Sequence, residues 1–109
     1  MELLEYIASW TLDYIVSQGM PATKMLITSA LKMDGKTYRK EIAKLKKEGL
    51  IRVERVYFGD WYEEGIGLNV RGWALTEKAR ELESVKRIEK EIEERIEQVF
   101  GIGRMSDVH

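Results

Sequence analysis

Hydrophobic side chains recur at helical spacing over most of the chain, and this spacing predicts a mainly helical protein. Residues 1–19 carry two adjacent apolar stripes that reach far around the cylinder, so we expect a first helix covered on more than one side. A shorter second helix is predicted over residues 21–33, with Pro21 in its first turn. Its inward face is expected to consist of Leu26, Ile27, Ala30 and Leu31.

A third helix is predicted over residues 35–48. Its inner face is expected to consist of Tyr38, Ile42 and Leu45. Asp34 precedes this helix, and its carboxylate is suited to accept hydrogen bonds from the free amides of the first turn. Gly49 follows the helix and adopts at little cost the left-handed backbone that commonly ends one.

The spacing changes from helical to alternating at residues 51–57, where apolar and charged side chains take turns. Such alternation is typical of a strand with one buried face. Glycines and acids fill residues 59–67, and a second strand is expected over residues 68–75. The two segments therefore predict a β-hairpin with a loose tip.

Residues 77–100 are predicted to form a long final helix, capped by Thr76, with Glu, Lys or Arg at nearly all of its polar positions. Its apolar seam is too long for so small a body to cover, and an exposed seam usually marks an interface. We therefore expect a homodimer in which the first and last helices pack against their copies; the alternative is that the last helix folds back on its own domain. The expected dimer contacts are Leu82, Val85, Ile88, Ile92, Ile96 and Val99. A single domain is expected over residues 1–100, with a mobile tail over 101–109.

Charge is distributed unevenly along a chain whose net charge is only −1. Residues 24–55 carry ten basic and four acidic residues, a net charge of +6, whereas the segments before and after are net negative. A positive potential confined to one third of the chain favours a polyanionic partner such as nucleic acid. The alternative is that these lysines only form a solvated helix face.

Residues 27–51, ITSALKMDGKTYRKEIAKLKKEGLI, resemble the helix-turn-helix of winged-helix regulators, the MarR- and PadR-like proteins among them. Residues 73–83, WALTEKARELE, look like the end of the second wing strand followed by the dimerisation helix. Lys32 stands where these families usually carry glycine. The resemblance covers roughly residues 20–83. It implies an α+β, mainly helical, winged helix-turn-helix fold with three helices, a β-hairpin wing and a long C-terminal dimerisation helix.

The resemblance implies a dimeric transcriptional regulator whose recognition helix, residues 35–48, enters the major groove of double-stranded DNA. Such a helix points its N-terminal residues at base edges and flanks them with cations for the phosphates. Arg39 is the best candidate for reading bases, because a guanidinium can bond bidentately to guanine. The expected base-reading residues are Lys36, Thr37, Arg39 and Lys40. The expected phosphate contacts are Lys44, Lys47, Arg52 and Arg55.

The predicted wing tip departs from the pattern of regulators that insert a basic wing into the minor groove. Its acids, which would repel phosphate, are Asp60, Glu63 and Glu64. The aromatic residues beside them are Tyr57, Phe58, Trp61 and Tyr62, which either pack the hairpin against the body or contact a partner. The alternative function is therefore a winged-helix protein-interaction module. A regulator whose dimer pocket senses a small apolar ligand also stays open.

Other chemistry is largely excluded by composition. The chain has no cysteine and a single histidine, His109, so disulfides and cysteine-based zinc sites are excluded, and we expect no metal and no cofactor. The sequence shows neither paired acids suited to a cleft nor a phosphate-cradling loop, so we do not expect an enzyme. No apolar run approaches the roughly 18 residues of a membrane span, and no secretory signal is visible, so we expect a cytoplasmic protein. Few Asn and Gln beside many Lys and Glu are a weak sign of a thermophile.

Overall fold

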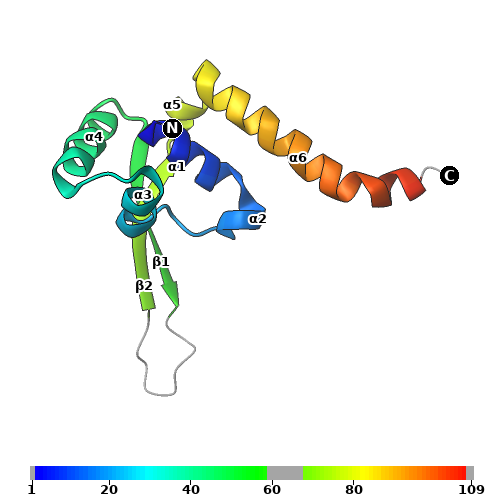
Figure 1. Ribbon diagram of the computed structural model, residues 1–109, viewed down its shortest axis with the longest axis horizontal. Helices are drawn as coiled ribbons and strands as arrows, with labels where there is room; N and C mark the ends of the chain where they lie inside the picture. The colour runs from blue at the N-terminus through cyan, green and yellow to red at the C-terminus, as the bar shows by residue number, and fades with distance from the viewer. Residues whose placement is uncertain (1, 59–67, 108–109) are drawn as a thin grey trace.

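The computed structural model describes residues 2–58 and 68–107. Its elements follow in the order α1 (Leu3–Leu12), α2 (Tyr14–Ser17), α3 (Lys24–Leu31), α4 (Gly35–Lys47), β1 (Ile51–Phe58), β2 (Leu68–Leu75), α5 (Glu77–Arg80) and α6 (Glu83–Asp107). The chain is thus α+β and mainly helical, with one antiparallel two-stranded hairpin among the described residues, as the hydrophobic pattern predicts (Figure 1).

The first helix of the sequence-based prediction is two helices in the structure, and the break falls at Asp13. The Asp13 carboxylate accepts a hydrogen bond from the backbone N–H of Val16 at 3.1 Å, so it caps α2 and begins a new helix where one continuous helix was expected. Within α1, Leu3, Ile7 and Ala8 are buried. After the break, α2 no longer packs its apolar side chains into the body: Tyr14, Ile15 and Val16 are all exposed.

The second helix begins at Lys24, three residues later than Pro21, where the sequence suggested its first turn. Thr23 caps it by accepting from the backbone N–H of Leu26 at 3.2 Å. The preceding Ala22 instead pairs with Trp73 through two backbone hydrogen bonds, of 3.0 and 2.9 Å, and so adds one residue to the edge of the sheet. Ala30 is exposed, which corrects the expectation that it faces inward.

Helix α4 matches its sequence-based prediction in bounds, cap and inner face. The Asp34 carboxylate accepts from the backbone N–H of Thr37 at 2.7 Å, and Gly49 takes the left-handed conformation with φ of 75°. The side chains of Tyr38, Ile42 and Leu45 are buried. The turn before α4 passes through Lys32, which has a φ of 51° in the position usually given to glycine.

The hairpin pairs Ile51 with Leu75 at its base and Phe58 with Leu68 at its outer end. Only the base lies in the core, where Ile51, Trp73 and Leu75 are buried. Gly72 allows the Ala22 segment to approach the sheet, because a β-carbon at position 72 would stand 2.6 Å from the Ala22 carbonyl oxygen. The outer half of the hairpin projects away from the helices (Figure 1).

The single final helix expected over residues 77–100 is also two helices. Thr76 caps α5 by accepting from the backbone N–H of Ala79 at 3.2 Å. The chain then closes a tight turn, with a bond of 3.1 Å from the Leu82 N–H to the Ala79 carbonyl, before α6 begins at Glu83. Helix α6 continues to Asp107, so part of the segment expected to be a tail is helical. Residues 108–109 lie outside the described residues.

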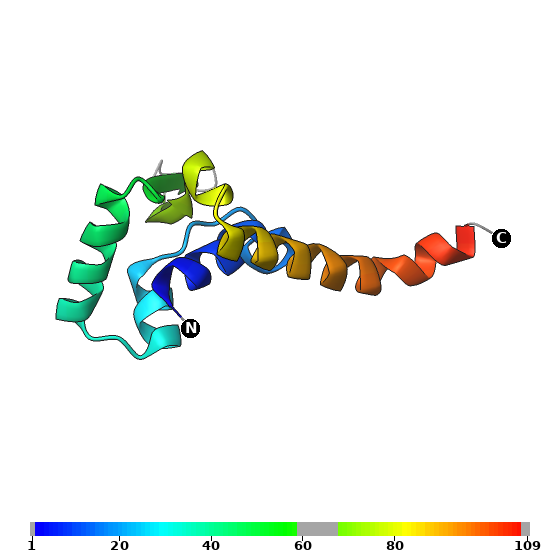
Figure 2. The same cartoon turned by 90° about the horizontal axis from the view of Figure 1, so that it is seen from above.

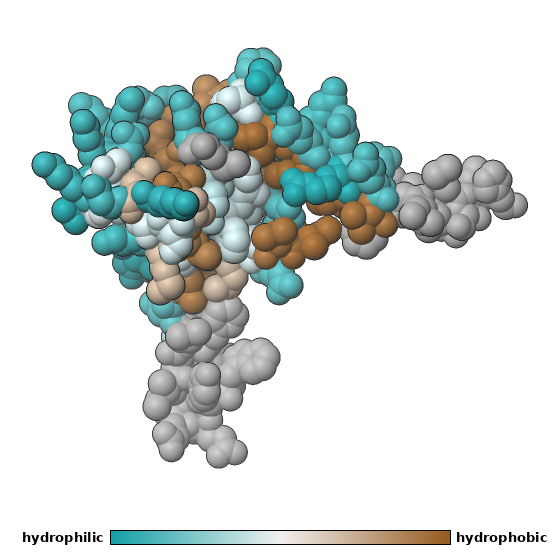
Figure 3. All heavy atoms as spheres, viewed as in Figure 1, coloured by the Kyte–Doolittle hydropathy of each residue, from teal (hydrophilic) through white to brown (hydrophobic). Residues whose placement is uncertain are grey.

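Helices α4 and α6 lie at opposite ends of the molecule. Figure 1 and Figure 2 both show α4 at one side of the body and α6 running outward from the other, well past the other helices. The surface differs accordingly: hydrophilic side chains cover the α4 side, whereas hydrophobic ones gather where α2 and α6 lie (Figure 3). The exposed apolar side chains of α2 therefore lie away from α4.

Candidate nucleic-acid interface

All eight residues expected to contact DNA are exposed in the structure, on α4 and on β1. Helical geometry places Lys36, Lys40 and Lys47 on the side of α4 directly opposite its buried residues, since successive residues turn by about 100°. Arg39 lies on one flank of this stripe, and its guanidinium approaches Gly35 in the first turn. Helix α4 stands at the edge of the body (Figure 1). The four cations are exposed to solvent.

Thr37 and Lys44 lie on the opposite flank of α4 from Arg39. Both line a hollow between α4 and the N-terminal end of α1, which includes Glu2 and Leu4. This flank is turned toward α1, not outward with the lysine stripe. The structure therefore does not bring all four expected base-reading residues onto one surface.

Arg52 and Arg55 stand on opposite faces of the hairpin, because side chains alternate along a strand. Arg52 lines a hollow with Leu12, Tyr14 and Arg80, in which α4 has no part. Its guanidinium also lies 3.7 Å from the Glu54 carboxylate, so a partner for its charge is already present. Of the two arginines expected to hold phosphates, Arg52 is thus separated from α4.

Arg55 shares its face of the hairpin with Trp73 and lies directly opposite Arg71 in the strand register. Lys24, the first residue of α3, places its ammonium 5.6 Å from the centre of the Tyr38 ring. Neither Lys24 nor Arg71 was among the expected DNA contacts. No local sequence pattern marks either residue, because α3 begins three residues later than the sequence suggested and the burial of Trp73 is seen only in the structure.

Asp34 is the one acid at the start of α4. Hydrogen bonds from Thr37, chiefly from its backbone N–H, hold the pKa of the Asp34 carboxyl below its ordinary value of 3.8, with a smaller contribution from the Arg39 charge. The Asp34 carboxylate therefore caps the start of α4. The outward stripe of the helix consists only of lysines and contains no acidic residue.

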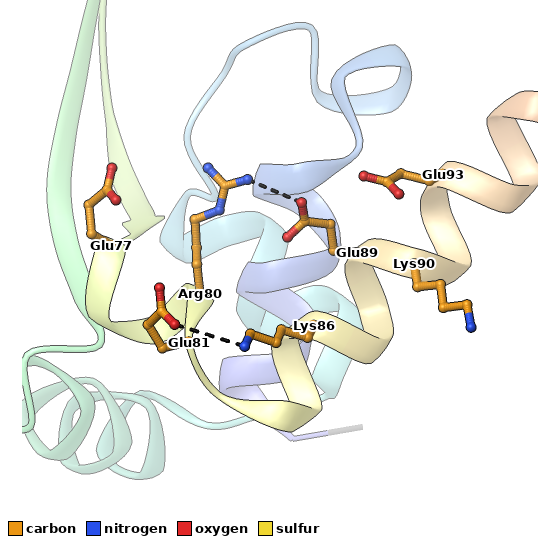
Figure 4. Close-up of a pocket in the computed structure, with 7 residues that line it drawn as sticks. All are labelled: Glu77, Arg80, Glu81, Lys86, Glu89, Lys90 and Glu93. Atoms are coloured by element: carbon orange, nitrogen blue, oxygen red, sulfur yellow. Dashed lines mark hydrogen bonds and ion pairs between the residues drawn. The ribbon is translucent and has the colours of Figure 1, made fainter.

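A second charged surface lies on α5 and α6. Figure 4 shows Arg80 reaching toward Glu89, at 3.3 Å, and Lys86 toward Glu81, at 3.9 Å. These ion pairs bridge the turn between the two helices. The remaining residues of this open hollow are Glu77, Lys90 and Glu93. Acids and bases are interleaved here, unlike the single-sign stripe of α4.

The residues expected at a dimer interface divide into two groups. Val85 is fully buried and Ile92 nearly so, and Leu82 and Ile88 pack against the core of the same chain. Helix α1 covers this half of α6. Val85 and Ile92 are therefore out of a partner's reach, which corrects the expectation that these two residues lie at the dimer interface, whereas Leu82 and Ile88 are only partly buried. Ile96 is half-buried, and Val99 is 65% exposed.

An ion pair links the distal half of α6 to the body. The Arg95 guanidinium lies 3.9 Å from the carboxylate of Asp13, at the junction of α1 and α2. Arg95 lies between Ile92 and Ile96 in the sequence, and this ion pair joins α6 to the break between α1 and α2.

No group of metal-ligating side chains occurs within residues 2–58 and 68–107. None of the helices in that part of the chain is long and apolar enough to cross a membrane. The acidic aromatic wing tip, with Asp60, Trp61, Tyr62, Glu63 and Glu64, lies outside the described residues, as does His109.

Comparisons of the chain with protein-family models, with curated proteins and with solved structures find no match.

Proposed function

We propose that this protein is a winged-helix DNA-binding protein that acts as a dimeric transcriptional regulator, with α4 in the major groove. The observation that carries the proposal is the stripe of Lys36, Lys40 and Lys47, flanked by Arg39, on a helix that stands at the edge of the body. A single-sign stripe on a protruding helix complements the phosphates that border a groove.

The order of elements supports the winged helix-turn-helix assignment. Helices α3 and α4 are joined by a short capped turn, and the hairpin of β1 and β2 follows α4 at once. Ala22 adds a third segment to the sheet through its pairing with Trp73. A helix pair followed by a small sheet is the arrangement expected for a recognition helix with a wing beside it.

The dimensions and side chains of α4 suit a groove. Its 13 residues span about 20 Å at about 1.5 Å per residue, and a major groove about 12 Å wide admits one helix. Lys36, Arg39 and Lys40 lie in its N-terminal half, where a recognition helix meets base edges. Thr37 is turned toward α1, so we assign the base contacts to these three cations and a phosphate to Lys47.

The apolar side chains left exposed at the other end of the body support a dimer. Tyr14, Ile15 and Val16 of α2 are 71%, 50% and 59% exposed. Val99 of α6 is 65% exposed. Burying this surface against a second copy would place two α4 helices in successive major grooves, about 34 Å apart, on an inverted-repeat site.

A double substitution, Arg39→Ala with Lys40→Ala, tests the assignment of α4. Both side chains are exposed, so the variant should keep its circular dichroism spectrum and its Tm. Its affinity for a labelled duplex should fall by about tenfold or more, since a good base contact is worth about 1–3 kcal/mol. The matched control is Arg87→Ala with Lys90→Ala, which removes the same two charges from the exposed surface of α6. Equal affinities for the two variants would contradict the assignment.

A second candidate function is a protein-interaction module that uses the wing. It is favoured by Tyr57, an aromatic side chain that is 65% exposed on the outer half of β1. Such a module would bind no duplex at low salt. Substituting Arg39 and Lys40 would then leave its partner binding intact, whereas Tyr57→Ala would weaken it.

A further inference from the structure

Four side chains from three elements form a continuous chain beside α4. The ammonium of Lys24 lies over the ring of Tyr38, at 5.6 Å from its centre. The indole N–H of Trp73 donates to the Tyr38 hydroxyl at 2.8 Å. The guanidinium of Arg71 lies over the Trp73 ring, at 5.8 Å from its centre. Two buried aromatic rings, joined by a hydrogen bond, thus carry an exposed cation at each end.

An aromatic ring holds a cation without neutralising it, because the attraction comes from the quadrupole of the ring and not from a net charge. Within the part of the chain that the structure describes, neither Lys24 nor Arg71 has an acid within ion-pair distance. Arg52 differs, since Glu54 lies 3.7 Å away. The charges of Lys24 and Arg71 are therefore held in place and left open to an external anion.

The strand register adds an independent sign of an anion here. Arg55 and Arg71 lie directly opposite each other on the same face of the hairpin. Like charges in that position destabilise a pair of strands, and a bound anion removes the repulsion. Both side chains are exposed, so the anion can approach from solvent.

We propose that Lys24 and Arg71, together with Arg55, bind phosphates of the DNA backbone that runs beside the groove occupied by α4. The proposal rests on the DNA-binding function proposed above. Tyr38 belongs to the first full turn of α4, so Lys24, held over its ring, lies next to the N-terminal half of the helix, where base contacts are assigned. Arg71 lies over the ring of Trp73, which is hydrogen-bonded to Tyr38. Phosphate contacts at this point would fix the depth and register of α4 in its groove.

The test uses the full chain with Lys24→Met and Arg71→Met together, because methionine keeps an apolar side chain over each ring while removing the charge. Fluorescence anisotropy with a random-sequence duplex is recorded across a salt series. Each lost phosphate contact should reduce the steepness of log K against log salt by about 0.9. We expect the slope to become shallower by about 1.8 for each protomer bound.

The matched control is Arg87→Met with Lys90→Met on α6, which should leave the slope unchanged. If the Lys24 and Arg71 variant, folded by circular dichroism, keeps the wild-type slope, these cations do not contact phosphate and the inference is overturned. A wild-type protein that binds no duplex would instead overturn the DNA-binding function itself, so the two failures are distinguishable.

Discussion

The indole Nε1 of Trp73 donates a hydrogen bond to the hydroxyl of Tyr38 at 2.8 Å, and both side chains are more than nine-tenths buried. The bond joins residues 35 positions apart in the sequence and links α4 directly to β2. It also satisfies a polar atom of each ring inside the core. The orientation of α4 against the hairpin therefore depends on one polar contact as well as on apolar packing.

Tyr38→Phe keeps the ring but removes the acceptor of this bond. The Trp73 N–H is then left buried without a partner, and we expect a loss of about 1–3 kcal/mol in the free energy of unfolding. Urea denaturation followed by tryptophan fluorescence measures the change. Tyr57→Phe removes a hydroxyl from a tyrosine that is 65% exposed and should change stability little. A Tyr38→Phe variant as stable as the wild type would show that the bond is energetically neutral.

Glycine substitutions at Lys32 and at Lys40 should change the stability of the protein in opposite directions. Its φ of 51° is costly for a residue with a β-carbon and costless for glycine. Lys32→Gly should therefore stabilise the protein by about 0.5–1 kcal/mol, whereas Lys40→Gly, inside α4, should destabilise it by about 1 kcal/mol. Thermal unfolding of the two variants measures both changes. A loss of stability in Lys32→Gly would contradict the left-handed conformation of the turn.

Asp34 predicts a component of the pH dependence of stability. Its pKa in the folded protein lies below the ordinary value of 3.8, mainly because of the hydrogen bond from the Thr37 backbone N–H. The charged carboxylate therefore stabilises the fold at pH values above about 4, and this stability is lost as the pH falls through the lowered pKa. Asp34→Asn keeps a capping oxygen but has no proton to gain. Its Tm should decline less than that of the wild type between pH 6 and pH 3.

The control for this comparison is Glu83→Gln, an exposed acid on α6 outside α4. It should follow the wild-type profile closely. Parallel profiles for Asp34→Asn and the wild type would mean that the Asp34 charge contributes nothing to the start of α4.

Substitutions at Val85 and Val99 test whether the first part of the apolar seam of α6 packs in the body while its later part is free for self-association. Val85 is fully buried in the body, so Val85→Ala should lower the free energy of unfolding by about 2–3 kcal/mol. Val99 is 65% exposed, so Val99→Ala should leave the fold intact and weaken self-association instead. Denaturation and sedimentation velocity separate the two effects. A chain that sediments as a monomer at all concentrations would contradict the proposed homodimer.

The caps and periodicities of local elements were predictable from sequence because their causes are local. Asp34, Thr76 and Gly49 act within a few residues of where they stand, and each does what its residue type suggests. The helical spacing of apolar residues in α4 and the alternation of apolar and charged residues in the first hairpin strand were equally easy to recognise in the sequence. The bounds of α4 and of both strands follow from these signals.

The breaks in the first and last helices were not predictable, since periodicity alone runs through them without interruption. Asp13 reads as one polar position in an apolar helix until its carboxylate is seen to accept from Val16. The turn at Glu81 and Leu82 carries no glycine or proline. It brings α6 back against α1, so the position of Val85 depends on tertiary packing that no local pattern encodes.

The candidate site was predictable only in part for the same reason. The lysine stripe of α4 follows from helical geometry, but the face on which Arg52 lies depends on how the hairpin docks. Lys24 and Arg71 were missed because the feature that unites them is the Tyr38–Trp73 contact between distant segments. The distribution of charge along the chain predicted the basic region of residues 24–55, but it did not predict which of these side chains share one surface.

The most direct test of the central claim is the salt dependence of duplex binding by the unaltered protein. Fluorescence anisotropy with a labelled random-sequence duplex gives the affinity at each salt concentration. A dimer that makes about 6–8 phosphate contacts should show log K falling against log salt with a slope of about −5 to −7. Negligible binding at low salt would contradict the claim and remove α4 as a DNA-reading helix.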